Sequence, residues 1–135
     1  MMPIALVVDD SMLIRHAVRR FLERRGFTVR TANDGAEALE ALKTFRPHVI
    51  FTDLQMPRLS GYELVELLKS SPETASIPVV ILAAKPSQEE PFRSNADWMI
   101  YKDLNIDRQL AQSLDNLLPA HAAVATPPST SSQYQ

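Results

Sequence analysis

The chain has 135 residues, of which 45% are hydrophobic, and this is enough to bury the core of one domain. Its formal net charge of −2 gives no basic excess that would indicate nucleic-acid binding. Cysteine is absent, which excludes disulfide frameworks, thiolate metal sites and cysteine nucleophiles. No apolar run approaches the roughly 18 residues of a membrane span, and residues 4–8 are too few for a signal-peptide core. We therefore expect a soluble cytoplasmic protein.

Short apolar segments alternate with helical patterns along the first part of the chain. Residues 4–8 form a continuous apolar run that ends in charge, as expected for a strand buried on both faces of a sheet. A helical pattern follows over 11–25, and Gly26 ends it. A second short strand is predicted over 27–32. The apolar positions of the first helix are Met12, Leu13, Ala17, Val18, Phe21 and Leu22.

An Asn-Asp-Gly turn precedes the second helix, which we predict over 36–45 with Asp34 and Glu37 as a capping box. The third strand, predicted over 48–52, presents Asp53 at its end. A loop over 54–60 then leads into a third helix. The apolar residues expected to face the core from these two helices are Ala38, Leu39, Leu42, Leu64, Val65, Leu67 and Leu68.

Two further strands and a last helix complete the pattern. The strands are predicted over 77–82 and 98–101, and the helix over 106–118. Between the two strands, residues 85–95 contain Pro86 and Pro91, so we expect only one or two helical turns there. The apolar stripe of the last helix, at i, i+4, i+7 and i+8, comprises Leu110, Leu114, Leu117 and Leu118.

The last 17 residues differ in composition from the rest of the chain. Residues 119–135 contain no Asp, Glu, Lys or Arg and have too little apolar bulk for a core. We therefore expect one domain over 1–118 and a flexible tail over 119–135. A docking peptide and a truncated linker are the alternative interpretations of this tail.

Strands that alternate with helices predict an α/β fold, in which a parallel sheet is covered on both faces and connected by right-handed crossovers. In such sheets ligands bind beyond the carboxyl ends of the strands, where Asp9, Asp53 and Lys102 fall. Asp9, Asp10 and Asp53 at one rim cannot all stay ionised unless a pKa rises or a cation joins them. Mg²⁺ suits such carboxylates with one backbone carbonyl. An ionised Asp53 can accept a phosphoryl group covalently, and Lys102 can pair with a phosphoryl oxygen.

Each of these features has an ordinary structural explanation when it is taken alone. An Asp-Asp-Ser sequence at a strand-to-helix junction is often only a helix N-cap. An aspartate at a strand end is usually a turn residue, and a lone lysine there is usually solvated. Their combination, on alternate elements of a five-strand pattern, favours a functional site.

Five short segments, together with Lys102, form a distinctive pattern: 7–11 (VVDDS), 33–39 (NDGAEAL), 53–61 (DLQMPRLSG), 77–80 (IPVV) and 96–97 (AD). In this pattern the chain resembles the receiver domain of two-component response regulators over about residues 3–118. The resemblance implies a doubly wound, flavodoxin-like fold with strand order 2-1-3-4-5, in which a histidine kinase or a histidine phosphotransfer protein phosphorylates Asp53. It also implies Mg²⁺ held by Asp10, Asp53 and the Gln55 carbonyl, with Asp9 in support, and Lys102 on the phosphoryl group.

The chain departs from the family pattern at the positions that relay phosphorylation. Ala83 stands where the family has a Thr or Ser hydroxyl that binds the phosphoryl group, and Met99 stands at the aromatic switch position. Asp103 replaces the usual proline after Lys102, so we expect a trans peptide there. With the shortened fourth helix at 85–95, these changes predict that Asp53 can be phosphorylated while the usual relay is absent.

Several functional interpretations follow from these departures. The first is a phosphorelay receiver that is not an enzyme and signals to an unknown output protein, and the second is a pseudo-receiver that works without phosphorylation. An aspartyl-phosphate hydrolase of the haloacid dehalogenase type needs a second Asp two residues after the nucleophile, where this chain has Gln55. No output segment follows residue 118, so output is by protein contact or the chain is part of a longer protein.

The remaining surface residues leave their roles open. The arginines of the first helix form either a solvated face or a docking surface for the kinase. Trp98 and Tyr101 fall on opposite faces of an edge strand, where each is either core or part of a homodimer or partner surface. The three histidines show no metal-ligand spacing.

Overall fold

A central sheet of parallel strands organises the computed structural model, which describes residues 2–84, 95–102 and 105–118. Each strand begins and ends within two residues of its predicted bounds. The sheet order is β2-β1-β3-β4-β5, so the predicted order is confirmed. The strands are β1 (Ile4–Val8), β2 (Thr28–Ala32), β3 (Val49–Asp53), β4 (Val79–Ala83) and β5 (Trp98–Tyr101).

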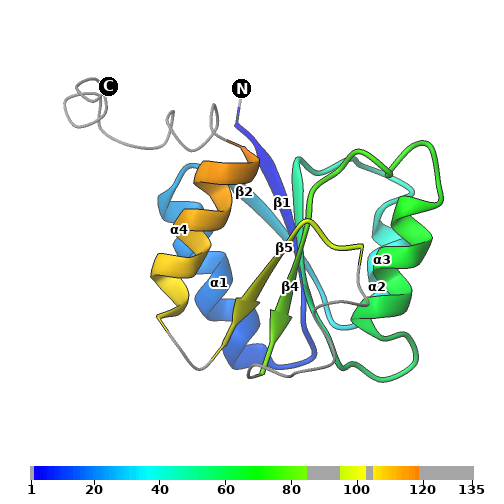
Figure 1. Ribbon diagram of the computed structural model, residues 1–135, viewed down its shortest axis with the longest axis horizontal. Coiled ribbons are helices and arrows are strands. Elements are labelled where there is room, and N and C mark those ends of the chain that lie inside the picture. Colours follow the sequence, from blue (N-terminus) through cyan, green and yellow to red (C-terminus); the bar gives the residue numbers. More distant parts are fainter. Residues whose placement is uncertain (1, 85–94, 103–104, 119–135) are drawn as a thin grey trace.

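Helices cover both faces of this sheet. As Figure 1 shows, α1 and α4 lie on one face and α2 and α3 on the other. α1 and α3 each connect two neighbouring parallel strands, and α2 connects β2 to β3 across β1, so strands alternate with helices as predicted. Their bounds are α1 (Met12–Arg24), α2 (Gly35–Ala41), α3 (Gly61–Lys69) and α4 (Ile106–Leu117).

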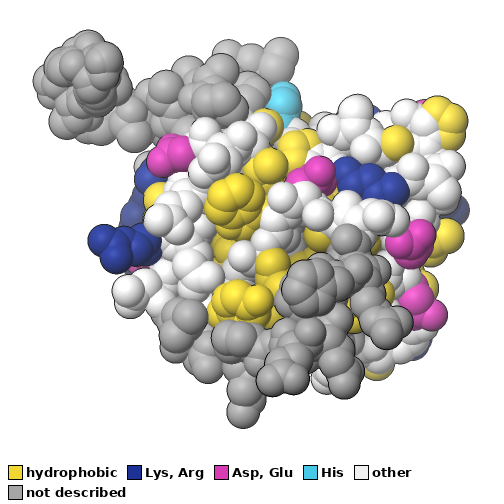
Figure 2. Space-filling view, viewed as in Figure 1, with side chains coloured by type: hydrophobic (Ala, Val, Ile, Leu, Met, Phe, Trp, Pro, Cys, Tyr) yellow, Lys and Arg dark blue, Asp and Glu magenta, His cyan; other side chains and the backbone are white. Residues whose placement is uncertain are grey.

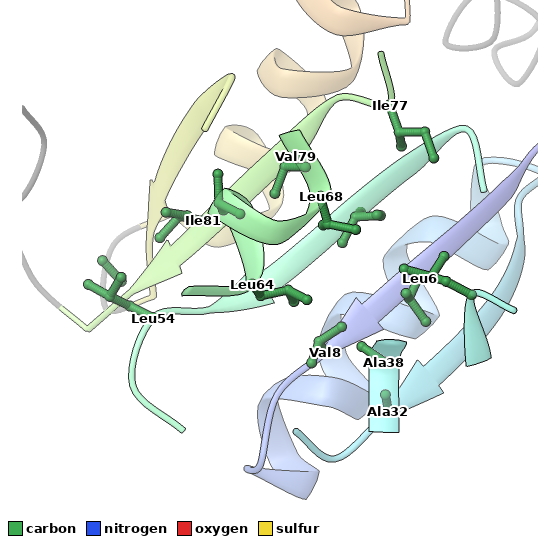
Figure 3. Close-up of a cluster of buried hydrophobic side chains, with 14 residues drawn as sticks. Leu6, Val8, Ala32, Ala38, Leu54, Leu64, Leu68, Ile77, Val79 and Ile81 are labelled. Carbon is green, nitrogen blue, oxygen red and sulfur yellow. The ribbon is translucent and has the colours of Figure 1, made fainter. Parts of the chain in front are cut away.

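The sheet separates two hydrophobic cores. Alternate side chains of one strand point to opposite faces, so Ala5 and Val7 join the core under α1 and α4, whereas Leu6 and Val8 join the core under α2 and α3. Figure 3 shows this second core, where Leu64 and Leu68 of α3 meet residues of β1 and β4. β1 and β4 are apolar throughout and β3 is apolar up to Phe51, because these strands are buried on both faces.

Side-chain caps begin three of the helices. The Ser11 side chain accepts a hydrogen bond from the Ile14 amide, 3.3 Å away, and Gly26 follows α1 with a φ of 92°. Ser60 and Glu63 form a full capping box on α3. Asp34 caps α2 as predicted, because its carboxylate accepts from the Glu37 amide. The other half of the predicted capping box differs: the Glu37 carboxylate accepts from the amide of Asn33 and not from that of Asp34.

Three of the apolar positions that indicated the first helix are exposed in the structure. Met12 and Leu13 are 72% and 77% exposed, and Ala17 also faces solvent. The buried stripe of α1 runs through Ile14, Val18 and Leu22, at i, i+4 and i+8. Adjacent residues of a helix differ by about 100° in direction, so apolar residues next to this stripe can still face away from the core.

The other helices agree more closely with expectation. α2 ends at Ala41, four residues early, because turns replace the helix before Pro47. Leu67 of α3 is 46% exposed, whereas its neighbours Leu64 and Leu68 are buried as predicted. Residues 85–94 and 119–135, where a short helix and a tail are predicted, lie outside the described residues, as does Asp103. Within the described ranges, no helix combines the length and apolarity needed to cross a membrane.

Candidate functional site

The carboxyl ends of three strands converge at one rim of the sheet. β1 is followed by Asp9 and Asp10, β3 ends in Asp53, and β5 is followed by Lys102. The carboxylates of Asp9, Asp10 and Asp53 offer oxygens that all lie within 4.8 Å of one another. Asp9 and Asp53 are buried and Asp10 is exposed, so the cluster opens to solvent on the Asp10 side.

Lys102 reaches this cluster from the edge of the sheet. Since β4 lies between β5 and β3, the Lys102 side chain must cross the end of β4. Its Nζ lies 2.9 Å from Asp53 Oδ1, to which it donates a hydrogen bond, and 3.0 Å from Asp9 Oδ2. Only 16% of this side chain is exposed, so one ammonium group neutralises part of the charge of two buried carboxylates.

The ionisation of Asp53 reflects competing effects. Burial raises its pKa, the hydrogen bond from Lys102 lowers it and the charge of Asp9 raises it again, with a net increase above the usual 3.8. Burial also lowers the pKa of Lys102, but its hydrogen bonds and charge pairing with Asp53 and Asp9 outweigh burial and raise that pKa above 10.5. Lys102 therefore stays a cation, while the ionised form of Asp53 is less favourable than that of an exposed aspartate.

The two buried carboxylates use their oxygens unequally. Asp53 Oδ1 accepts from Lys102 and from the Leu54 amide, 2.8 Å away, and no described residue donates to Oδ2. Asp9 Oδ1 accepts from the Ser11 amide at 2.8 Å. Its Oδ2 is buried without a directed hydrogen bond from any described residue, although it lies within ion-pair distance of Lys102. The site thus retains acceptor capacity suited to a cation.

The loop after β3 is fixed at both of its ends. The Gly61 amide donates to the Leu54 carbonyl at 2.8 Å, and a Cβ on Gly61 would lie 2.2 Å from the Asp53 carbonyl oxygen, so only glycine fits. Arg58 has a φ of 71° and forms an ion pair with Asp34, whose pKa is lowered by the Glu37 amide and by Arg58. These contacts set the course of the loop that carries Gln55, which is exposed.

Ala83 ends β4 beside Lys102, whereas Met99 lies further back in β5, where it pairs with Ile81. Ala83 is 1% exposed and accepts a hydrogen bond from the Lys102 amide through its carbonyl, 2.8 Å away. Its methyl group offers no hydroxyl to the site. Met99 is half-buried and packs against the core under α2 and α3. Their roles in phosphoryl binding and switching stay predictions.

Three polar contacts around the cluster had no clear signal in the sequence. Arg15 donates to the Asp9 carbonyl at 2.8 Å, so at least one arginine of α1 is more than a solvated or docking residue. Gln109 of α4 bonds the backbone of Tyr101. The Arg58–Asp34 ion pair joins two loops that are far apart in the sequence. Each depends on a tertiary distance that spacing along the chain does not reveal.

Comparison with known proteins points to one family. The model of the response regulator receiver domain matches residues 5–114. The chain is 41% identical over 110 residues to the response regulator MprA of Mycobacterium ulcerans, covering 79% of this chain and 47% of that protein. It therefore spans about half the length of this curated relative.

Solved receiver structures have the same fold. The chemotaxis protein CheY4 of Vibrio cholerae is 31% identical, with a TM-score of 0.81 over 87% of this chain and 100% of that chain. The response regulator TrrA of Thermotoga maritima, solved in complex with Mg²⁺ and BeF, is 28% identical, with a TM-score of 0.77 over the same shares. With its order of strands and its acidic pocket, the chain belongs to the response regulator receiver domain family.

Proposed function

We propose that this receiver domain accepts a phosphoryl group on Asp53 in a Mg²⁺-dependent reaction and passes the signal on by contact with another protein. The main support is the unequal use of the Asp53 carboxylate. Lys102 and the Leu54 amide hold Oδ1 in place, whereas Oδ2 receives no hydrogen bond from a described residue and is available to react.

The donor set fits a small hard cation. Carboxylates at this separation, with a buried Asp9 oxygen that faces only the Lys102 ammonium among the described residues, suit Mg²⁺, which prefers oxygen ligands and retains some of its waters. We propose Asp10, Asp53 and the Gln55 carbonyl as ligands, with Asp9 in support. When bound, Mg²⁺ would supply positive charge that offsets the repulsion among the carboxylates and the incoming phosphoryl group. The TrrA complex with Mg²⁺ and BeF supports this assignment.

The transfer itself requires little beyond position and charge. An Asp53 carboxylate oxygen forms the bond to phosphorus as the P–N bond to a donor phosphohistidine breaks, and the histidine nitrogen leaves with the bonding electron pair. Lys102, now 2.9 Å from Asp53 Oδ1, would pair with a phosphoryl oxygen as charge develops there. The product is an aspartyl phosphate.

The exposed start of α1 is our candidate for the donor's docking surface. Met12 and Leu13 project into solvent two and three residues after Asp10, and arginines follow on the same helix. An apolar patch with cationic neighbours at the open side of the pocket suits a histidine kinase or a histidine phosphotransfer protein. Such a donor acts in the cytoplasm, where we propose that this chain works. The output protein, and a homodimer through β5, are further proposals.

A specific observation keeps a second function in view. The buried methyl of Ala83 replaces the hydroxyl that would bind the phosphoryl group, and Met99 cannot donate a hydrogen bond. A pseudo-receiver, which binds its partner without phosphorylation, would have no use for that hydroxyl. In this case the acidic pocket would be a structural remnant stabilised by Lys102.

Phosphorylation by a small donor separates the two functions. Incubation with Mg²⁺ and acetyl phosphate, followed by intact mass measurement, should show a mass increase of one phosphoryl group. Asp53→Asn should abolish the adduct, and omission of Mg²⁺ should prevent it. Asp107→Asn, which changes an exposed acid in the first turn of α4, serves as the matched control and should be modified like the wild type. An unmodified wild type would favour the pseudo-receiver.

A further inference from the structure

The end of β5 is held from both sides. Along a strand, successive residues direct their backbone groups to opposite edges, and the Lys102 amide points inward to the Ala83 carbonyl of β4. The N–H and C=O of Tyr101 therefore point outward, away from the sheet. β5 is an edge strand of the sheet, and no other strand among the described residues receives them.

The Gln109 side chain takes the place of that missing strand. Its Oε1 accepts from the Tyr101 N–H at 2.9 Å, and its Nε2 donates to the Tyr101 carbonyl at 2.9 Å. One amide thus satisfies both outward groups of a single residue, as a neighbouring backbone would. On the face seen in Figure 2, hydrophobic side chains gather over α4 and β5.

Tyr101, whose backbone Gln109 holds by these two hydrogen bonds, immediately precedes Lys102. A lysine side chain has four rotatable bonds, so its ammonium reaches two carboxylates across β4 only if its backbone is fixed. In this chain Asp103 occupies the position where the family places a rigid proline. We infer that Gln109 is a positioning residue that holds the end of β5 and so keeps the Lys102 ammonium on Asp53 and Asp9. This inference deepens the proposed function, because it concerns the cation of the same pocket.

The first test removes the amide and measures phosphorylation kinetics. Gln109→Met retains the length of the side chain but loses both hydrogen bonds. We expect the maximal rate of phosphorylation by acetyl phosphate to fall by roughly tenfold, as for a misaligned catalytic group. Mg²⁺ affinity should change by less than about twofold, because Lys102 is not a metal ligand. Gln112→Met, an exposed position on the same helix, should leave both quantities unchanged.

A double-mutant cycle separates positioning from a general loss of stability. If Gln109 acts through Lys102, then in a Lys102→Met background the change Gln109→Met should alter the rate by less than about twofold. A full tenfold loss in that background would overturn the inference. Should Gln109→Met fail to fold, Gln109→Glu retains the acceptor for the Tyr101 N–H, loses the donor, and allows the same cycle.

Crystal structures of the wild type and of Gln109→Met make the test independent of phosphorylation. In the wild type the Lys102 ammonium should lie within ion-pair distance of Asp53 and Asp9, as it does here, and in Gln109→Met it should leave these carboxylates. A Lys102 ammonium that keeps both contacts in Gln109→Met would overturn the inference. A wild-type chain that takes no phosphoryl group would contradict the proposed function alone, because the position of the ammonium would still decide the role of Gln109.

Discussion

At Asp53, the requirements of a reactive carboxylate conflict with those of a stable fold. Burial and the charge of Asp9 disfavour the ionised form, and the Lys102 ammonium compensates for only part of that effect. Ionisation of Asp53 is therefore less favourable in the folded chain than in the unfolded chain. Functional sites commonly show this conflict, because the charges that bind a cation also repel one another when the cation is absent.

The conflict has a measurable consequence for Asp53→Asn. Since the pKa of Asp53 in the folded chain lies above 3.8, the folded state binds this proton more tightly than the unfolded state. The contribution of this group to the free energy of unfolding therefore falls as pH rises through the raised pKa. Asn removes the charge and keeps an acceptor for Lys102. In metal-free buffer at pH 7 we expect a Tm about 2–5 °C above wild type, measured by calorimetry.

The pH dependence of this Tm difference provides its control. The gain should shrink as pH falls below the raised pKa, where wild-type Asp53 is itself protonated, and millimolar Mg²⁺ should reduce it by stabilising only the wild type. Asp107→Asn should show no such pattern. If Asp53→Asn were less stable than wild type at pH 7, the ion pair with Lys102 would outweigh burial, contrary to our assignment.

For individual residues, the sequence predicted which side chains form the candidate site more successfully than it predicted the contacts among them. The positions of Asp9, Asp53 and Lys102 follow from their places at strand ends, because parallel strands bring those ends to one rim. That one ammonium would contact both buried carboxylates did not follow, since it depends on the path of a long side chain. Gln109 gave no signal, because a glutamine beside an apolar stripe is usually solvated.

Among the elements, the loop between β3 and α3 is the most tightly constrained. Its two ends meet through the bond from the Gly61 amide to the Leu54 carbonyl, and the Arg58–Asp34 ion pair anchors its middle to the start of α2. Arg58 adopts a left-handed conformation that costs a non-glycine residue about 1 kcal/mol. The loop carries Gln55, whose carbonyl we propose as a metal ligand, so its shape bears on the proposed metal site.

Two glycines next to this loop should respond differently to alanine. At Gly61 a Cβ would meet the Asp53 carbonyl oxygen at 2.2 Å, and backbone at the end of β3 cannot move without disturbing the sheet. We expect Gly61→Ala to lower the free energy of unfolding by about 2–3 kcal/mol in urea denaturation. At Gly35 a Cβ would lie 2.7 Å from Leu59 Cδ2 and 2.9 Å from Leu59 Cβ, so the half-buried Leu59 must shift slightly as well as rotate, which costs less than moving the end of β3.

Gly35→Ala is the matched control for that comparison. Alanine gains up to about 1 kcal/mol of helix propensity at the start of α2, which offsets the displacement of Leu59. Its net effect should therefore be below about 1 kcal/mol in either direction. Equal losses of unfolding free energy in Gly61→Ala and Gly35→Ala would mean that the loop tolerates displacement at Gly61, contrary to a fixed loop shape.

The sequence predicted the elements well where burial dominates. β1, β3 and β4 are buried on both faces, and such strands appear as apolar runs. It failed at the surface of the helices. Met12 and Leu13 are apolar and fit a helical period, yet the period alone does not show which face meets the sheet. The first turn of α1 is exposed beside the pocket, where apolar residues suit a partner better than a core.

In the molecule as a whole, the acidic pocket is intact, whereas the residues expected to relay phosphorylation from the pocket to the rest of the domain are altered. The carboxylates and Lys102 come from β1, β3 and β5, and their contacts are in place. The next strand position, Ala83, contributes only a methyl group, and Met99 on β5 packs into the core under α2 and α3 without a hydroxyl. A phosphoryl group on Asp53 would therefore lack the hydrogen bond that normally couples it to β4.

This gap predicts a localised response to a phosphoryl mimic. With Mg²⁺ and beryllofluoride, amide chemical-shift changes should concentrate near Asp10, Asp53 and Lys102 and stay small over residues 85–101. Ala83→Ser restores a hydroxyl where a phosphoryl oxygen would lie, and one charge-assisted hydrogen bond should tighten beryllofluoride binding by about tenfold. Ala84→Ser, an exposed neighbour, should have no effect. Large wild-type shift changes across 85–94 would mean that this chain relays phosphorylation without the hydroxyl, and our account of the altered route would be wrong.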